Sequence, residues 1–380
     1  MFFGIIEDFN NIIFFYRLII FAFVKMVNLI DNIKIIVVII LLGFYICIKK
    51  VENKSGIFAI LVLKFGIILI FANSYINLSN PNRASQCLNQ LNHVIKNRNI
   101  IPIRILKPHL LFKPFNEFFI STSHNTYLPC YQNGDIASVD AISLALKMGA
   151  RVIELDVFTK NNLGCLPEDY EPIVTHGIKL NSGDIFTTEF LLFSECVQTI
   201  KKFSDTTSDP IWLEIELNTD NPQTQKVIKQ IIQQIFSTKL LGPEYKIKNK
   251  VKHFSQEPIK NLLDKIIITT SKKINILDDY LSDVFDSYVG DGYYLNNSTS
   301  CNINKANNQI QRVYPQANIS GHFSLNYDPE PFWKKHVQLV AMNFQTLDNH
   351  MVKNLTMFKS CSFIHVSEFE IKNSNFDIAL

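Results

Sequence analysis

The sequence predicts an α/β barrel that occupies the chain from about residue 112 to the C-terminus. Short apolar runs of strand length recur along this part, and segments with apolar residues at helical spacing lie between them. Such alternation is typical of strands and helices that wind around a parallel sheet. A chain of 380 residues has room for one barrel of about 250 residues and one further N-terminal segment.

The predicted elements follow one another in strand and helix order. The strands are FFIST, ARVIELDVF, EPIVTH, PIWLEIEL and DKIIITT, which begin at Phe118, Ala150, Glu171, Pro210 and Asp264. Between them, apolar residues at helical spacing predict helices over Ser138–Met148, Phe190–Phe203 and Thr224–Phe236.

The first 78 residues are a hydrophobic segment unlike the rest of the chain. Its three apolar runs are shorter than the roughly 20 residues that cross a bilayer, and Arg17, Lys34 and Lys64 interrupt or flank them. We expect one or two membrane-embedded segments here, including a transmembrane helix. The alternatives are a buried helical hairpin, a cleaved signal sequence or a misassigned start of the reading frame. Residues 79–111, rich in Asn and Pro without a clear period, are expected to form a linker.

Charge and cysteine content narrow the class of protein. The net charge is only +3, and the lysines are scattered among acids, which gives no argument for binding nucleic acid. Seven cysteines lie far apart without a C-x-x-C pair, which fits neither a disulfide framework nor a zinc site. We therefore expect a catalytic domain in the reducing environment of the cytoplasm.

Polar residues capable of chemistry stand at the ends of the first two predicted strands. His124 and Asn125 follow FFIST, where barrels carry reactive groups, although a loop histidine alone is weak evidence. Glu154 and Asp156 stand two residues apart on one strand, so they point to the same face. Their mutual repulsion favours a hard divalent cation between them. The alternative is an edge strand whose acids face solvent, but the flanking residues are too apolar for that.

The next two predicted strands repeat this pattern. His176 ends the third strand and is followed by Gly177, while Glu214 and Glu216 lie two residues apart on the fourth. Chance placement of such residues at four consecutive strand ends is improbable. The combination predicts a cation held by Asn125 and carboxylates, with two histidines for proton transfer and charge stabilisation.

These residues resemble eukaryotic phosphoinositide-specific phospholipases C. The segment from Phe115 to Lys273 is similar to the family's X-box, through SHNTY, ELDVF, VTHG and the strand that ends near Glu216. The C-terminal part is similar to its Y-box, through LSDVFDSY, QRVYPQ, NYDPEPFW and QLVAMNFQT. The resemblance implies a distorted TIM (β/α)8 barrel, with an X half at 112–273, a short linker at 274–280 and a Y half at 281–380.

The resemblance also implies a reaction. Family members hydrolyse phosphatidylinositol 4,5-bisphosphate, or a less phosphorylated phosphoinositide, to diacylglycerol and an inositol phosphate through a cyclic phosphodiester, in lipid signalling. The implied Ca2+ ligands are Asn125, Glu154, Asp156 and Glu216, which leaves Glu214 outside the ligand set. His124 would stabilise charge on phosphorus. Likewise, His176 would protonate the diacylglycerol oxygen, and Glu154 would be the base for the inositol 2-hydroxyl.

Further residues correspond to the family's head-group contacts. Arg312 matches the arginine that binds a ring phosphate, Tyr314 the tyrosine that packs on the ring, and Ser298 a serine near the same phosphate, with Ser300 as the alternative register.

The chain departs from the family where two lysines usually grip the ring phosphates. Thr269 and Ser271 stand at those positions, and Lys272 and Lys273 follow one or two residues later. Lys272 is therefore the predicted lysine contact, and without it the preference would shift toward less phosphorylated lipids.

Partners and location follow from the same resemblance. The expected partners are the phosphoinositide and a membrane surface, with the catalytic domain facing the cytoplasm. The short stretch between the boxes predicts that the family's long acidic insert is absent. No calcium- and lipid-binding β-sandwich is visible in the sequence, so the hydrophobic N-terminal segment is expected to recruit the barrel.

Two other classes remain as alternatives. One is a catalytically inactive, phosphoinositide-binding scaffold of the same fold. The other is the bacterial-type, calcium-independent barrel, against which the paired acids and the Y-box argue.

Overall fold

The computed structural model describes residues 81–373, except for 133–135, 162–163, 180–184, 187–188, 243–244, 246–252, 272–283, 290, 292, 300–308 and 317–324. The hydrophobic segment at 1–78 and the stretch at 274–280 lie outside the described residues. Among the helices that are described, none is long and apolar enough to cross a membrane.

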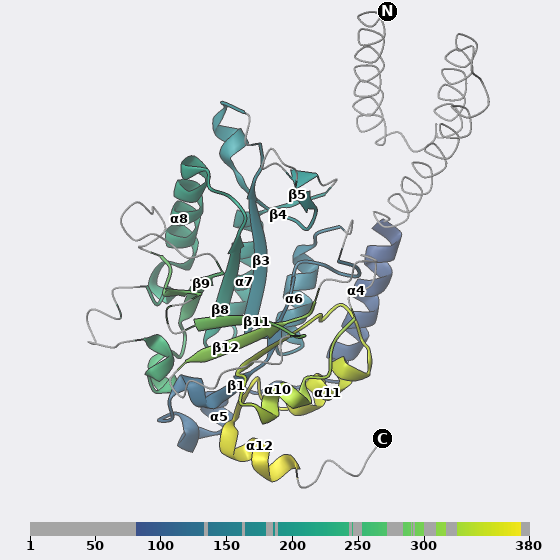
Figure 1. Ribbon diagram of the computed structural model, residues 1–380, viewed down its shortest axis with the longest axis vertical. Coiled ribbons are helices and arrows are strands. Elements are labelled where there is room, and N and C mark those ends of the chain that lie inside the picture. Colours follow the sequence, from purple (N-terminus) through teal and green to yellow (C-terminus); the bar gives the residue numbers. More distant parts are fainter. Residues whose placement is uncertain are drawn as a thin grey trace, which may run out of the picture. The chain divides into compact units, whose positions relative to one another are not determined.

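Parallel strands build the centre of the described chain (Figure 1). In spatial order they are β10 (Ser287–Tyr288), β9 (Ile266–Thr270), β8 (Ile211–Leu217), β3 (Val152–Thr159), β2 (Thr122–Ser123), β13 (Leu339–Met342), β12 (Ile310–Tyr314) and β11 (Tyr293–Asn297). A parallel bridge between Val289 and Tyr293 joins the two end strands, so the sheet nearly closes on itself. The predicted TIM barrel is confirmed, with β2, β3, β8 and β9 contributed by the X half and β10, β11, β12 and β13 by the Y half.

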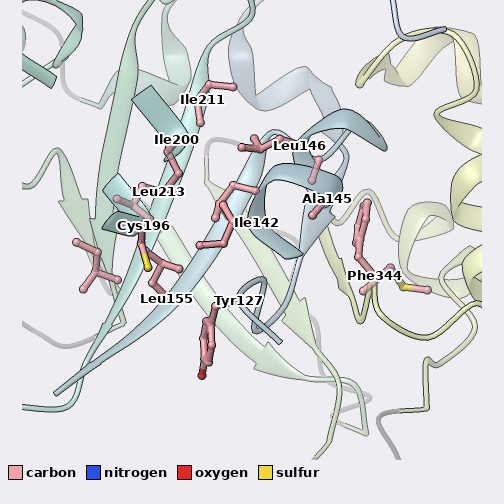
Figure 2. Close-up of a cluster of buried hydrophobic side chains, with 14 of the residues drawn as sticks. Tyr127, Ile142, Ala145, Leu146, Leu155, Cys196, Ile200, Ile211, Leu213 and Phe344 are labelled. Carbon is pink, nitrogen blue, oxygen red and sulfur yellow. The ribbon is translucent and has the colours of Figure 1, made fainter. Parts of the chain in front are cut away.

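Three helices pack on the outside of the first barrel strands. They are α6 (Val139–Lys147), α7 (Phe193–Ser204) and α8 (Pro222–Phe236), each within a few residues of its predicted range. The Ser138 hydroxyl accepts from the N–H of Asp140 at the start of α6, and the Asn221 side chain caps α8 in the same way. Figure 2 shows part of the apolar cluster between these helices and the sheet, with Ile142, Leu146, Leu155, Ile200 and Leu213 among its members.

A second apolar cluster lies at the amino-terminal end of the barrel. It gathers residues from strand starts, such as Trp212 and Tyr293, with Phe115, Phe254 and Phe363 from segments around them. Because apolar side chains fill this end, the polar residues of the strands are left at the carboxyl ends, where barrels carry their sites.

The remaining described elements surround the barrel. The strands are β1 (Phe118–Ile120), paired antiparallel with β14 (Phe363–His365), and β4 (Pro172–Val174), β5 (Ile178–Lys179), β6 (Ile185–Phe186) and β7 (Leu191–Leu192). The helices are α5 (Ile103–Leu106), α10 (Glu330–Lys334), α11 (Asn349–Met357) and α12 (Val366–Asn373).

The expectation that residues 79–111 form a linker is wrong for much of that range. Helix α4 (Pro81–Lys96) packs against α6, and Leu91 is buried in the main cluster. Ala84 and Leu88 precede Leu91 at spacings of seven and three residues, which places them on the same face of the helix. The many Asn and Gln residues between them concealed this amphipathic pattern.

The expectation that the cysteines stay unpaired is also wrong. A disulfide joins Cys87 of α4 to Cys130, which lies in the loop after β2. Three other described cysteines are free: Cys165 is exposed, and Cys196 and Cys361 are buried. Two cysteines that are 43 residues apart meet only because α4 packs on the barrel, which a linker would not do.

Candidate active site

The predicted acids of β3 and β8 lie side by side in the barrel. In the parallel pairing of the two strands, Glu154 is opposite Glu214 and Asp156 is opposite Glu216. Leu155 and Ile215 alternate with them and belong to the apolar cluster beneath the helices. The period of two along each strand therefore directs all four acids into the barrel, as the sequence predicted.

Glu154 stands at the centre of this group. Arg312 on β12 lies with its Nη2 2.8 Å from Glu154 Oε1. The other carboxylate oxygen accepts from the backbone N–H of Asn125 at 3.0 Å and lies 3.8 Å from His124 Nε2. Burial alone would raise the pKa of Glu154. The charge of Arg312, followed by that of His124 and the backbone N–H of Asn125, lowers that pKa, so the carboxylate stays ionised.

Asp156 and Glu216 form no ion pair within the described part of the chain, and the charge of Arg312 offsets only part of what raises their pKa. Burial, followed by the charges of Glu216 and Glu154, raises the pKa of Asp156 well above its usual value. Burial and the charge of Glu154 likewise raise the pKa of Glu216. Two acids with raised pKa values in one buried space indicate that positive charge is needed there.

The atoms around Asp156 fit a hard divalent cation. Asp156 Oδ1 and Asn125 Oδ1 are buried and have no hydrogen-bond partner among the described residues, and both are oxygen donors of the kind that Ca2+ prefers. Across the described residues, no three His, Cys, Asp or Glu side chains are already grouped as a metal cluster. Asn125 also lies at a φ of +44°, a left-handed conformation that asparagine adopts more readily than most residues.

His176 reaches the site by a route that the sequence did not predict. Strand β4 was expected to be one of the parallel strands, but it runs antiparallel along the end of β3, with Val174 opposite Val157. This turn brings the chain back toward the barrel, and Thr175 N–H donates to Asp156 O at 3.4 Å. Burial, and then the charge of His124, lowers the pKa of His176 to about 4.

The predicted head-group residues lie at the ends of β11 and β12. The Tyr314 ring is nearly parallel to that of His124, with centroids 6.4 Å apart and an interplanar angle of 16°. Ser298 is half-buried beside Tyr314, and its hydroxyl accepts from Gln316 N–H at 3.2 Å. Arg312 is almost fully buried against Glu154. Lys272 falls outside the described residues.

Thr269 shows what replaces the missing lysine on β9. Its hydroxyl donates to the Glu214 carboxylate and accepts from Trp212 Nε1 at 2.6 Å. Burial raises the pKa of Glu214 to about 8, even though the charge of Arg312 and the Thr269 hydroxyl act in the opposite direction. Glu214 is therefore protonated and uncharged at neutral pH, so it needs no lysine to balance a negative charge.

Three residues of the site were missed in the sequence. The Tyr127 hydroxyl donates to Thr175 O at 3.2 Å, and burial, followed by the charge of the nearby Asp156, raises the pKa of Tyr127 well above its usual value. Gln132 and Asn343 hydrogen-bond His124 or Asn125. Amides and tyrosines carry no distinctive spacing, and only the position of Tyr127 within SHNTY could have drawn attention to it.

Comparison with known proteins places these residues in a family. The X domain of phosphatidylinositol-specific phospholipase C matches residues 111–272, and the Y domain matches residues 290–365. Together these ranges include every predicted site residue and well over half of the chain.

Two curated relatives illustrate the similarity. The human 1-phosphatidylinositol 4,5-bisphosphate phosphodiesterase beta-2 is 24% identical over 355 residues, which covers 67% of this chain and 29% of that protein. The 1-phosphatidylinositol 4,5-bisphosphate phosphodiesterase 1 of Saccharomyces cerevisiae is 26% identical over 331 residues, which covers 67% and 36%. The chain thus spans about a third of the length of these relatives.

Solved structures support the fold. PLC21 of L. pealei is 22% identical with a TM-score of 0.54, covering 68% of this chain and 38% of that one. PLC21 of S. officinalis has the same identity and TM-score, with coverage of 72% and 40%. With the X and Y domains matched in order on a parallel barrel, this chain belongs to the eukaryotic phosphoinositide-specific phospholipases C.

Proposed function

We propose that this chain is a calcium-dependent phospholipase C that hydrolyses a phosphoinositide to diacylglycerol and an inositol phosphate, in lipid signalling. The observation that carries the proposal is the convergence of two histidines, an asparagine and three carboxylates at the carboxyl end of one barrel. The family match gives the reaction class, and the site supplies each group that the reaction needs.

Asn125, Glu154, Asp156 and Glu216 are the residues that would hold Ca2+. They offer oxygen donors only, and two of these atoms are buried without a partner from any described residue. When bound, the ion lowers the pKa of an attacking hydroxyl and offsets charge on the phosphoryl oxygens.

Glu154 is the proposed base for the inositol 2-hydroxyl, whose attack on phosphorus gives the cyclic phosphodiester. The charge of Arg312 lowers the pKa of Glu154 and so weakens it as a base. A phosphorylated inositol ring competes with Glu154 for Arg312, because a guanidinium binds phosphate as readily as carboxylate. Head-group binding would then restore the basicity of Glu154.

The two histidines act on different oxygen atoms of the phosphodiester in the same step. The pKa of His176 is about 4 in the lipid-free structure, so its ring is neutral at neutral pH. A phosphate diester next to the ring favours the protonated form, which can then give its proton to the diacylglycerol oxygen. His124 Nε2 faces Glu154, and once the ring has taken up a second proton there it can donate to a phosphoryl oxygen as negative charge builds up.

Head-group preference depends on the groups around the ring. Arg312, Tyr314 and Ser298 are the proposed contacts, together with Lys272. Thr269 on β9 hydrogen-bonds Glu214 and Trp212. It therefore supplies no positive charge to the head group where a lysine would. Phosphatidylinositol 4,5-bisphosphate is the proposed substrate. A lysine at position 269 would strengthen the preference for this lipid over less phosphorylated phosphoinositides, and with threonine there we expect that preference to be smaller.

The proposed place of action is a membrane surface, with the barrel facing the cytoplasm, because the lipid substrate lies there. A disulfide such as that between Cys87 and Cys130 persists mainly in oxidising compartments, so a barrel that faces the cytoplasm should carry these two cysteines in the reduced form. Mapping the thiols of the chain isolated from cells under alkylating conditions tests this point.

A head-group assay tests the function. The full chain is incubated in mixed micelles with phosphatidylinositol, its 4-phosphate or its 4,5-bisphosphate, with and without Ca2+, and products are followed by 31P NMR. We expect calcium-dependent turnover with a transient cyclic phosphodiester. Lipid binding without turnover of any head group would contradict the proposal and support the inactive scaffold.

A further inference from the structure

An unbroken series of side-chain hydrogen bonds links the proposed catalytic histidine to a proposed metal ligand. His124 Nδ1 lies 2.9 Å from Asn343 Oδ1, and Gln132 Nε2 donates to the same oxygen at 2.9 Å. Gln132 Oε1 in turn accepts from Asn125 Nδ2 at 2.5 Å. We propose that Gln132 and Asn343 are positioning residues, which fix the tautomer of His124 and turn the amide oxygen of Asn125 into the site. This inference deepens the proposed function and rests on it.

Asn343, which follows β13, determines which atoms of this series donate a hydrogen bond and which accept one. Its Nδ2 donates to Leu325 O at 3.4 Å, and its backbone N–H donates to Asn326 Oδ1 at 2.6 Å. Asn326 Nδ2 donates back to Asn343 O at 3.2 Å. With its nitrogen engaged on the far side, Asn343 presents its oxygen to His124 and Gln132.

That oxygen determines where the proton of His124 lies. An amide oxygen only accepts, so the neutral ring carries its proton on Nδ1. Nε2 is then the nitrogen that faces Glu154 and the reacting phosphate. The hydrogen bond made by one ring nitrogen sets the state of the other, so Asn343 keeps Nε2 available to exchange a proton with the site.

Gln132 transmits the same constraint to Asn125. Because its amide nitrogen donates to Asn343, its oxygen must face Asn125 and accept from Nδ2. The remaining atom of that amide, Asn125 Oδ1, is buried and has no partner in the part of the chain that the structure describes. An unsatisfied buried oxygen is destabilising unless a ligand uses it, so Gln132 holds in place an orientation that suits a cation.

Gln132 has a second connection, to His176. Its backbone lies near the His176 ring and acts to raise the pKa of that ring, and the loop that carries it is tied to α4 through the disulfide of Cys130. One loop residue therefore contacts the network of both histidines and of the metal ligand, although it carries no charge itself.

The experiment uses the full chain and begins without metal. The 15N signals of the His124 ring are assigned by comparison with His124→Ala, above neutral pH. We expect a protonated Nδ1 and a bare Nε2 in the unsubstituted chain, and transfer of the proton to Nε2 or a tautomer mixture in Asn343→Leu. An unchanged tautomer in a folded Asn343→Leu would overturn the role of Asn343.

The role of Gln132 is read from calcium binding by calorimetry. Gln132→Met keeps the length of the side chain but neither donates nor accepts well, and we expect about 10- to 100-fold weaker Ca2+ binding. Gln132→Glu keeps the acceptor for Asn125, so we expect it to bind Ca2+ more tightly than Gln132→Met does. Equal affinity of Gln132→Met and the unsubstituted chain would overturn this role, and so would absence of calcium binding in the unsubstituted chain.

Gln338→Met is the matched control. Gln338 precedes β13 at the opposite end of the barrel, where its side chain accepts from Gln311 N–H and donates to Asn116 O, both at 3.0 Å. Its loss removes a comparable pair of hydrogen bonds, and we expect it to change neither the tautomer nor the calcium affinity. Because both readouts are independent of turnover, they decide this inference even if no lipid is hydrolysed.

Discussion

Arg312 and Glu154 form a buried ion pair across the barrel, with Nη2 and Oε1 2.8 Å apart and both side chains at most 4% exposed. The pair joins a residue of the Y half to a residue of the X half that lies far from it in the sequence. It provides the positive charge that keeps one of the four acids ionised, and it couples the proposed head-group arginine to the proposed base.

Removal of Arg312 should destabilise the fold strongly. Arg312→Met leaves the Glu154 charge buried without a partner, and breaking such a pair typically costs about 3–5 kcal/mol. The free energy of unfolding, measured with urea, should fall by that amount. The control is Lys353→Met, which breaks exposed contacts with Asp328 and Glu330, for which we expect at most about 1 kcal/mol. Similar losses for the two variants would contradict a buried pair.

Glu214 should make stability depend on pH. Its folded-state pKa is raised to about 8 from a usual 4.5, so its contribution is fully present below about pH 4.5 and is lost as the pH rises to about 8. A tenfold change in a group's acid dissociation constant corresponds to about 1.4 kcal/mol. Glu214→Gln cannot ionise and should gain in melting temperature relative to the unsubstituted chain as the pH rises from 5 to about 8, in the presence of a chelator. A difference that does not change with pH would show that the pKa of Glu214 is not raised.

Calcium should stabilise the chain through Asp156. A ligand at about 100 times its dissociation constant contributes about 2.7 kcal/mol, and the ion would relieve the repulsion that raises the pKa of Asp156 and Glu216. We expect Asp156→Asn to melt at a higher temperature than the unsubstituted chain without calcium, and to lose most of the calcium-dependent increase. Asp328→Asn, which removes an acid paired with Lys353 on the surface, should retain that increase. An undiminished calcium effect in Asp156→Asn would exclude Asp156 as a ligand.

The described cysteines should react in a fixed order. Alkylation of the native chain without reductant should label the exposed Cys165 and leave Cys87 and Cys130 unlabelled until a reductant is added. Cys196 and Cys361 are buried, and burial raises the pKa of Cys361 to about 11, so both should react only after unfolding. Peptide mass spectrometry distinguishes these cases. Rapid labelling of Cys87 and Cys130 without reductant would exclude the disulfide.

Local sequence patterns predicted much of the barrel and of its site. The apolar runs gave β3, β8 and β9, and the period of two placed Glu154 and Asp156 on one face of their strand and Glu214 and Glu216 on one face of theirs. The pairing that sets the two pairs of acids opposite each other is a finding of the structure. Helix α4 could have been predicted from its apolar spacing, but its polar composition resembled that of a linker.

Contacts between distant parts of the chain could not be predicted in this way. The antiparallel direction of β4, which delivers His176, depends on pairing with β3 and leaves no mark in either strand. The same holds for Arg312 with Glu154, and for Cys87 with Cys130. Gln132 and Asn343 were missed because amides serve many structural roles, and only their neighbours give these two a chemical one.

The central claim is that His124 and His176 perform chemistry on a phosphoinositide bound at this end of the barrel. It is tested most directly by single-turnover hydrolysis of phosphatidylinositol 4,5-bisphosphate in the presence of Ca2+, comparing the full chain with His124→Ala and His176→Ala while lipid binding is measured separately. We predict a rate loss of about 100- to 10,000-fold for each variant, with lipid binding retained. Hydrolysis that persists at the original rate in either variant would contradict the account.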